Sequence, residues 1–558
     1  SQTDTLTEKD VKSSKGNKFL LINGDFKGIQ NFIFSSSADS QKFRSKILRG
    51  RSFAVSLLSE LAADMICREI GLPITSIILN AAGKFTIIAP NISGVKSSID
   101  KVKKEINDWL VKISFGETIF NIAVIQASSK DFSNDKFIDL WDRLNREMEK
   151  EKYSGFEVSS YGVVEGYLDK FINKPGDSAI CPLCGKRPAV EVFQKELMCK
   201  VCRDHIFLGS NIVKKKRLSI YFINNSSKSE NCLHEPVFGK YQISFSTDLT
   251  KYQNNILKCW SLEREDSANS DVTVKFIKGY IPVYAENDLE DDRIAIKNDE
   301  PIIVGDPKTL NHIACMAKLH DSKKAGKYDG VESLGVLKAD VDHLGRLMAC
   351  GLKKERFTLS RLATLSRQLN YYFSVYLPWF LENSEFNNIY TVFAGGDDLF
   401  LIGPWNSAIE LAGSIQKSFA DYVCHNKNIT ISAGISIHKP HTPIDIMSES
   451  SEEFLEKAKS EGRDRLTLFS VTAEWAEVQE LMTIEDTFKR WLDKGWISRV
   501  MFYNLNDFIK MAEKEKQVIK KEEIHINDMA CTKWRSLLAY AVNRNIGKKS
   551  SDKERIKQ

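Results

Sequence analysis

Apolar and polar residues follow a recurring order along the chain, first seen in residues 18–175. A strand pattern and turn at 18–34 lead into a strongly helical stretch at 54–70. Two apolar runs, 75–79 and 85–90, flank a short polar turn, and a helix at about 94–112 and a strand at 120–126 follow. Strand–helix–strand–strand–helix–strand is the ferredoxin-like order, which predicts one such domain here.

The same order returns in residues 331–475. A strand beginning at Leu334 ends in acidic residues, and a helical stretch, a hairpin, a helix, a strand and a helix follow, at 358–382, 390–404, 406–425, 428–436 and 449–460. Self-similarity of this kind indicates an internal duplication. The predicted fold class is therefore α+β, with two ferredoxin-like domains.

The hairpin of the second domain carries the most distinctive residues of the chain, Gly395-Gly396-Asp397-Asp398. Paired glycines suit a tight turn between two strands. Adjacent carboxylates repel each other unless a cation neutralises them, and divalent cations prefer oxygen ligands. A solvated turn is the alternative, because Gly and Asp are ordinary turn residues.

The internal duplication favours a metal site at this hairpin over a solvated turn. Asp340 ends the first strand of the second domain, and in this topology that strand neighbours the hairpin, so Asp340 and Asp397 are expected to converge. The first domain has Asp25 at the matching strand end, but Lys27 and Lys84 are expected at the positions of the other acids. The second domain is therefore predicted to be catalytic and the first to be degenerate.

Between the two domains, residues 176–210 form a four-cysteine insert. Two Cys-x-x-Cys pairs, separated by fourteen residues, supply Cys181, Cys184, Cys199 and Cys202. This spacing is typical of a structural tetrahedral zinc site, and two matched pairs argue against a redox role.

Composition indicates the number of domains and the cellular compartment. With 558 residues, 42% hydrophobic and 27% charged, the chain suggests three or four globular domains. Net charge is only +5, and no apolar run approaches the roughly 18 residues that span a bilayer, so we expect no membrane contact. Eleven cysteines without a signal peptide indicate a reducing, cytoplasmic location.

The remaining segments are predicted from their patterns. Residues 1–17 look like a disordered lead-in, 211–330 like a β-rich linking segment, and 476–558 like a helical domain. That domain has four aromatic residues that could be core or interface anchors: Trp491, Trp496, Phe502 and Trp534. The only His-Asp pair, His320-Asp321, has no histidines close by, so a His-Asp nuclease is not expected.

Four motifs in order carry a family resemblance: residues 24–30 with 48–53, the four-cysteine insert, residues 338–345, and residues 393–400. Together they resemble the large palm-domain subunit of type III-A (Csm) CRISPR–Cas effector complexes. The resemblance implies palm folds similar to polymerases and nucleotide cyclases, and conversion of ATP to cyclic oligoadenylate after target RNA binding. It also implies CRISPR RNA, target RNA, a small subunit and the crRNA 5′-end-binding subunit as partners.

The resemblance also implies residue roles. Catalytic residues and ligands of two Mg²⁺ or Mn²⁺ ions about 4 Å apart would be Asp340, Asp397 and Asp398. Further cofactor contacts would come from Gly395, Gly396, the Val341 carbonyl and Asp342. Lys459, in Ala-Lys-x-x-Gly-Arg, is a candidate phosphate ligand, or else a solvated helical lysine.

The acceptor nucleotide is expected in the cleft between the two palms. Arg49, Arg51 and Lys84 are candidate phosphate or RNA contacts, although the arginines could instead pair with acids at a domain interface. Many relatives begin with a His-Asp nuclease domain, which this sequence does not show.

Two alternatives to the synthase stay open. The chain could be a catalytically silent scaffold, or a cyclase with a different nucleotide product, such as a diguanylate cyclase. The intact acidic motif favours catalysis, and the duplication and the zinc insert count against a diguanylate cyclase.

Overall fold

The computed structural model describes residues 16–35, 43–81, 83–133, 135–154, 180–223, 232–246, 256–263, 273–295, 302–320, 328–396, 398–520, 523 and 525–546. The chain divides into two compact units. One holds residues 1–319 and 328–473, and the other holds residues 320–327 and 474–558. All but the last two residues of the expected lead-in lie outside the described residues.

The first palm has the predicted order. Its elements are β1 (Phe19–Lys27), α2 (Ile29–Phe34), α3 (Arg44–Glu69), β2 (Ile77–Ala81), β3 (Lys84–Pro90), α4 (Val95–Ser114), β4 (Ile119–Ala127) and α5 (Phe137–Ser154). The strands form one sheet in the order β2-β3-β1-β4. Helix α4 buries residues at spacings of three and four, from Val95 through Ile99, Val102 and Ile106 to Leu110, which seat it on the sheet.

The second palm repeats this order with additions. Its elements are β13 (Leu334–Val341), α10 (Leu344–Cys350), α11 (Leu359–Tyr371), α12 (Leu377–Glu382), β14 (Tyr390–Gly395), β15 (Asp398–Pro404), α13 (Trp405–Tyr422), β16 (Ile431–His438), α14 (Ile444–Ser460), β17 (Arg465–Leu468) and β18 (Val471–Glu474). The sheet order is β14-β15-β13-β16-β17-β18. The last two strands, and the parallel pairing of β17 with β16, were not expected from the sequence.

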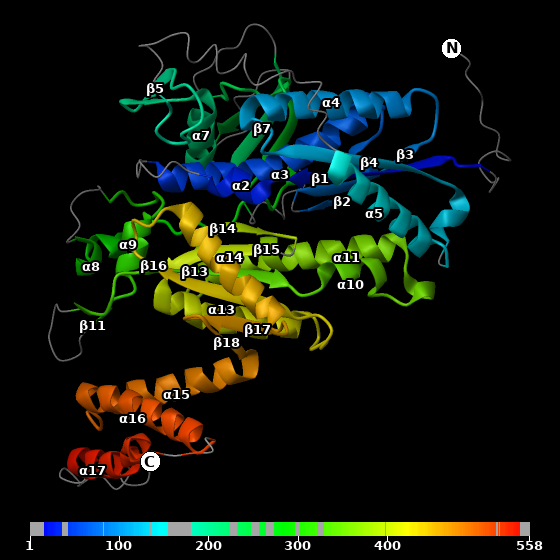
Figure 1. Cartoon of the computed structure of the whole chain (residues 1–558). Coiled ribbons are helices and arrows are strands. Elements are labelled where there is room, and N and C mark those ends of the chain that lie inside the picture. Colours follow the sequence, from blue (N-terminus) through cyan, green and yellow to red (C-terminus); the bar gives the residue numbers. More distant parts are fainter. Residues whose placement is uncertain are drawn as a thin grey trace. The chain divides into compact units, whose positions relative to one another are not determined.

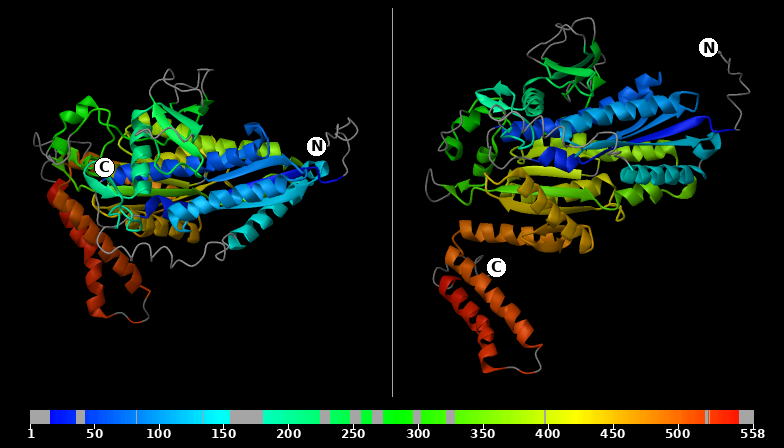
Figure 2. Two further views of the ribbon diagram at one scale, coloured as in Figure 1. Left: turned by 90° about the horizontal axis from the view of Figure 1, so that it is seen from above. Right: turned by 45° about the horizontal axis from the view of Figure 1, so that its top comes forward.

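The two palms contact each other reciprocally, side by side (Figures 1 and 2). Helix α3 of the first palm packs against β14 of the second, and its counterpart α11 packs against β2 of the first. The pair α2 and α14 is likewise matched by the pair α10 and α5. Equivalent elements therefore exchange equivalent contacts, so a pseudo-two-fold axis relates the palms and passes between their central hairpins.

The four-cysteine insert is fixed to the first palm through one close helix crossing. Helix α7 (Lys200–Lys214) lies against α3. A Cβ atom on Gly209 would lie 1.9 Å from the Lys46 carbonyl oxygen, and one on Gly50 would lie 1.8 Å from that of His205. Only glycine allows the two backbones to approach this closely.

The described part of the linking segment, for which a β-rich structure was predicted, contains a four-stranded sheet. The sheet order is β10-β9-β7-β8, from β7 (Arg217–Phe222), β8 (Tyr241–Ser246), β9 (Ile256–Ser261) and β10 (Thr273–Val274). After β10 the chain runs along the edge strand β14 of the second palm, where the Thr391 amide donates to the Tyr280 carbonyl (2.9 Å). This segment covers backbone groups that would otherwise be unpaired at a sheet edge.

The second compact unit is helical, as predicted. Its helices are α15 (Trp475–Asp493), α16 (Arg499–Val518) and α17 (Trp534–Ile546). Trp491 packs edge-on against Phe488 beside a small core, and the Trp534 indole donates to Glu515 (2.7 Å). No described helix in either unit is both long enough and apolar enough to cross a membrane.

Candidate active site

Two carboxylates of the second palm face each other across neighbouring strands. Asp340 on β13 pairs directly with Asp398 on β15, and Asp398 also pairs with Gly395 on β14. The hairpin turns at Gly396, whose φ of 69° lies in the left-handed region that glycine adopts without steric cost. Asp397 lies outside the described residues, so its role as a ligand stays a prediction.

Helix α14 places a lysine on this pair. The Lys459 ammonium lies 2.7 Å from Asp340 Oδ2 and 3.0 Å from Glu456 Oε1. Burial lowers the pKa of Lys459, but the hydrogen bonds to Asp340 and Glu456 outweigh it and leave the pKa above its ordinary value. Lys459 is therefore a protonated group of the acidic site, in place of the solvated helical lysine considered from the sequence.

A second lysine lies beneath the carboxylates, and sequence reasoning missed it. Lys338, two residues before Asp340 on the same face of β13, has a side chain only 4% exposed and forms an ion pair with Glu452 of α14. Burial lowers the pKa of Lys338, while nearby Asp398 and Asp340 oppose that shift. The signal was present in the sequence as a charged residue in the middle of a strand whose other residues, apart from Asp340, are apolar or glycine.

The first palm reaches this network through Gln30 of α2, whose amide nitrogen donates to the same Glu452 carboxylate (3.4 Å). Val341, expected to offer its carbonyl, is buried at the end of β13 opposite Ile431.

The Asp342 carboxylate accepts hydrogen bonds from donors within the protein itself. Its Oδ1 accepts from the Ser432 hydroxyl (2.7 Å), and its Oδ2 accepts from the Thr430 hydroxyl (2.8 Å) and the Asp464 amide (3.0 Å). The side chain is 1% exposed, and the Arg463 guanidinium lies 3.9 Å away. We interpret Asp342 as a positioning residue that ties β16 and the turn after α14 to the end of β13, in place of the expected cofactor contact.

The first palm contains the counterpart of this site. Asp25 and Lys84 face each other across β1 and β3. The Lys152 ammonium of α5 lies 3.6 Å from Asp25 Oδ2 and 2.9 Å from Glu149 Oε1. The lysine-to-aspartate pair therefore recurs in both palms, and the second acid is replaced by a lysine in the first.

The strand register corrects one equivalence drawn from the sequence. Lys84 pairs with Ala81 as Asp398 pairs with Gly395, so Lys84 corresponds to Asp398 and not to Asp397. The sequence comparison was one residue out of register, because apolar patterning alone does not fix where a short turn closes. The conclusion that the first palm lacks the acidic pair is unchanged.

A hollow of about 370 Å³ lies where the two palms meet, bordered by both central hairpins. From the first palm come Ser52, Ser56, Ser59, Asn80, Ala81 and Gly83, and from the second come Arg367, Asn370, Thr391 and residues 392–395. Asn80 Nδ2 and Thr391 Oγ1 are buried without a hydrogen-bond partner among the described residues. Buried polar atoms without partners are rare, so these two offer contacts to a ligand.

The arginines of this region differ in exposure. Arg49 and Arg51 are each 4% exposed, and they donate to the backbone carbonyls of Gly209 and of Ile33 and Ser35. Arg49 thus joins the first palm to α7 and Arg51 joins α3 to the end of α2, so neither is available for phosphate or RNA. Arg367 on α11, which the sequence did not single out, is exposed and forms no ion pair with a described residue.

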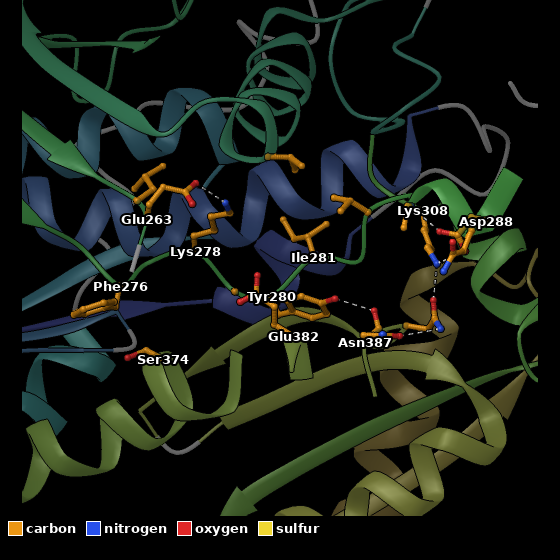
Figure 3. A pocket seen from close by; sticks show the side chains of 17 residues that line it. Glu263, Phe276, Lys278, Tyr280, Ile281, Asp288, Lys308, Ser374, Glu382 and Asn387 are labelled. Carbon is orange, nitrogen blue, oxygen red and sulfur yellow. Dashed lines mark hydrogen bonds and ion pairs between the residues drawn. The ribbon is translucent and has the colours of Figure 1, made fainter. Parts of the chain in front are cut away.

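A larger hollow of about 580 Å³ adjoins this one (Figure 3). Its lysines are already paired: Lys278 lies 3.4 Å from Glu263, and Lys308 lies 2.7 Å from Asp288 and 2.8 Å from Asn388 (Figure 3). Neutralised lysines make this hollow a weak anion site.

The four cysteines of the insert converge as predicted. Their sulfur atoms lie within 4.8 Å of one another and all four residues are buried. Hydrogen bonds from Cys181, and also from Cys199 and Cys202, lower the pKa of Cys184. Four convergent sulfurs fit a tetrahedral zinc ion, for which thiolates are preferred ligands. Among the described residues this is the one such group of three or more metal-ligating side chains.

Comparisons with known proteins point to one family. Residues 333–467 match the Cas10/Cmr2 second palm domain, and residues 18–165 match Csm1 subunit domain B. A relative from Methanocaldococcus jannaschii, the CRISPR system single-strand-specific deoxyribonuclease Cas10/Csm1 (subtype III-A), is 30% identical over 82% of this chain and 58% of that protein. A protein of the same name from Thermococcus onnurineus is 24% identical over 97% of this chain and 67% of that protein.

The chain therefore spans between about half and two thirds of the length of these relatives. Among solved structures, an apo Csm1–Csm4 cassette matches with a TM-score of 0.65 and 21% identity, over 97% of this chain and 66% of that one. A Csm1–Csm4 cassette in complex with cA3 matches with a TM-score of 0.67 and 20% identity, over 99% and 68%. These similarities bear out the fold.

Proposed function

The chain belongs to the Cas10/Csm1 family, and we propose that its second palm joins ATP molecules into cyclic oligoadenylates within a type III-A effector complex. One observation carries the proposal: Asp340 pairs with Asp398, and Asp398 pairs in turn with Gly395, which lines a hollow shared by the two palms. Nucleotidyl transfer needs an acidic metal site close to bound nucleotide, and this arrangement offers a pair of acids next to a hollow of about 370 Å³.

The residues present fit a divalent metal site. Asp340 and Asp398 offer hard carboxylate oxygens on adjacent strands, and the sequence adds Asp397 next to Asp398. These residues would hold two Mg²⁺ or Mn²⁺ ions, which lower the pKa of an attacking ribose hydroxyl and stabilise the leaving pyrophosphate. Lys459 offers its protonated ammonium to the triphosphate of the donor ATP, and Lys338 offsets the repulsion between the carboxylates.

The second nucleotide, the acceptor, occupies the hollow between the palms. Asn80 from the first palm and Thr391 from the second contribute the buried polar atoms without partners, which suit the edge of a base or a ribose hydroxyl. Arg367 contributes a positive charge for phosphate. The first palm thus contributes binding surface and no metal, in keeping with its Asp25 and Lys84 pair.

The partners follow from the relatives. The structural neighbours are Csm1 proteins bound to Csm4, one of them also with cA3. By analogy this chain would act in the cytoplasm beside a crRNA 5′-end-binding subunit and a small subunit, and respond to target RNA paired with CRISPR RNA. The deoxyribonuclease activity in the relatives' names is not part of the proposal, which concerns the acidic residues of the second palm.

The test uses the full chain assembled with its partners, labelled ATP, Mg²⁺ or Mn²⁺, and cognate target RNA, with products identified by mass spectrometry. We expect pyrophosphate and cyclic oligoadenylates that depend on the RNA. No turnover of ATP or GTP would support the scaffold reading. Turnover of GTP in place of ATP would support a different cyclase, and pyrophosphate release independent of RNA would contradict the effector role.

A further inference from the structure

A third hollow, beside the one between the palms, is walled by aromatic side chains. It measures about 890 Å³, within the range of ligand sites, and is lined by Phe276, Tyr371, Val375, Tyr376, Trp379, Glu382, Asn383 and Tyr422. Tyr371, Trp379 and Tyr422 are 43%, 51% and 38% exposed. Aromatic side chains that line a surface hollow offer stacking contacts to a ligand.

The aromatic surface lies where the helix from α11 to α12 changes its winding. Between α11 and α12 the helix widens into one π-helical turn, Tyr372–Tyr376. Pro378 lacks the amide that would bond the carbonyl four residues earlier, which favours such a turn. Tyr376 stacks on Tyr372 with 5.3 Å between ring centroids and lies 6.1 Å from Trp379. Tyr422 also packs against the buried Tyr372, with 5.2 Å between ring centroids, so two of the exposed rings, Trp379 and Tyr422, have aromatic neighbours.

This aromatic hollow shares lining residues with the hollow between the palms. Phe276 and Tyr371 line both, and Phe276 and Glu382 also border the polar hollow of Figure 3. Arg367 precedes Tyr371 by one helical turn and lines the hollow between the palms. An oligonucleotide that extends from the hollow between the palms toward this surface would thus pass the Arg367 guanidinium first and the aromatic rings next.

We propose that the aromatic hollow binds the adenine bases of the growing linear oligoadenylate, an inference that rests on the proposed function. Aromatic rings stack on nucleobases, and every base has a face that can stack. Apart from Glu382 the lining carries no charged group, which suits bases better than phosphates. The acceptor oxygens of Glu382 and Asn383 at its rim match the exocyclic amine of adenine. Holding the chain here would keep its 3′ end near Asp340 and Asp398 for the next addition.

The test measures binding without catalysis. The full chain is titrated with the linear trinucleotide ApApA in EDTA by calorimetry. Trp379→Ala is expected to weaken binding between about fivefold and 150-fold, the range for loss of one stacked base, and Trp379→Phe to retain most of it. Phe469→Ala, which removes a 64% exposed ring outside the hollow, is the matched control and should bind as the wild type does.

Two results would overturn the proposal: no binding of ApApA by the wild type, or equal binding by Trp379→Ala. Equal binding would indicate that the exposed rings contact a protein partner and not the oligonucleotide. A non-hydrolysable ATP analogue should bind Trp379→Ala normally, because Trp379 does not line the hollow between the palms. During turnover, Trp379→Ala should shift products toward dinucleotides. If the wild type makes no product, the proposed function fails, but the ApApA titration still decides this inference.

Discussion

Asp342 provides a sharp test of how the site is built, because its position in the sequence suggests a cofactor contact and its surroundings suggest a positioning role. The carboxylate is buried and accepts hydrogen bonds from Thr430, Ser432 and the Asp464 amide. Hydrogen bonds to a charged group contribute about 1.5–3 kcal/mol each. The cost of burying the carboxylate offsets part of their sum.

Asp342→Ala is therefore expected to lower the free energy of unfolding by about 3–5 kcal/mol, as when one partner of a buried charged network is removed. Asp342→Asn keeps the shape but points an amide donor at other donors, and should cost about 1–3 kcal/mol. Turnover should fall only about tenfold in Asp342→Asn, through displacement of the helix that carries Lys459.

The assay pairs urea unfolding of the purified chain with ATP turnover by the assembled complex. Asp421→Asn is the matched control, because its carboxylate is 58% exposed and pairs only with His425 among the described residues; it should change both readings little. If Asp342→Asn unfolded like the wild type yet lost all turnover, the carboxylate would act on the cofactor, and the positioning role would be refuted.

Three further predictions concern other features. Gly209→Ala should destabilise the chain by about 3 kcal/mol in urea unfolding, because its Cβ would meet the Lys46 carbonyl, whereas Gly345→Ala, with open space around it, should not. Elemental analysis should find one zinc ion per chain, lost in Cys199→Ser. Lys459→Ala should lower ATP turnover about 100-fold. Because the pKa of Lys459 is raised, its ion pair with Asp340 is fully formed below the ordinary lysine pKa and is lost only as the pH rises above that value. The pH profile of wild-type turnover between pH 6 and 9 should therefore show no titration of Lys459.

Much of this architecture was predictable from the sequence. The duplicated order of strands and helices, the glycine hairpin and the cysteine spacing each follow from local patterns, and the structure has them where expected. Asp340 was expected at the hairpin because the topology makes its strand a neighbour, and it pairs with Asp398. Local periodicity and turn chemistry suffice for such features.

What the sequence could not provide depends on contacts between distant residues. Arg49 and Arg51 look like phosphate ligands in the sequence, yet both are buried against backbone carbonyls, which no local pattern reveals. The one-residue error at Lys84 arose because register is set by strand pairing. The reciprocal packing of the palms, and with it the hollow at Asn80 and Thr391, exists only in three dimensions.

We propose above that the paired acids of the second palm perform nucleotidyl transfer. The most direct measurement is RNA-dependent pyrophosphate release from ATP by complexes that contain Asp340→Asn, or Asp397→Ala with Asp398→Ala, beside the Asp421→Asn control. We expect activity at background in both acidic-site variants and near wild type in the control, with all three chains folded and assembled. Wild-type release by either acidic-site variant would contradict it.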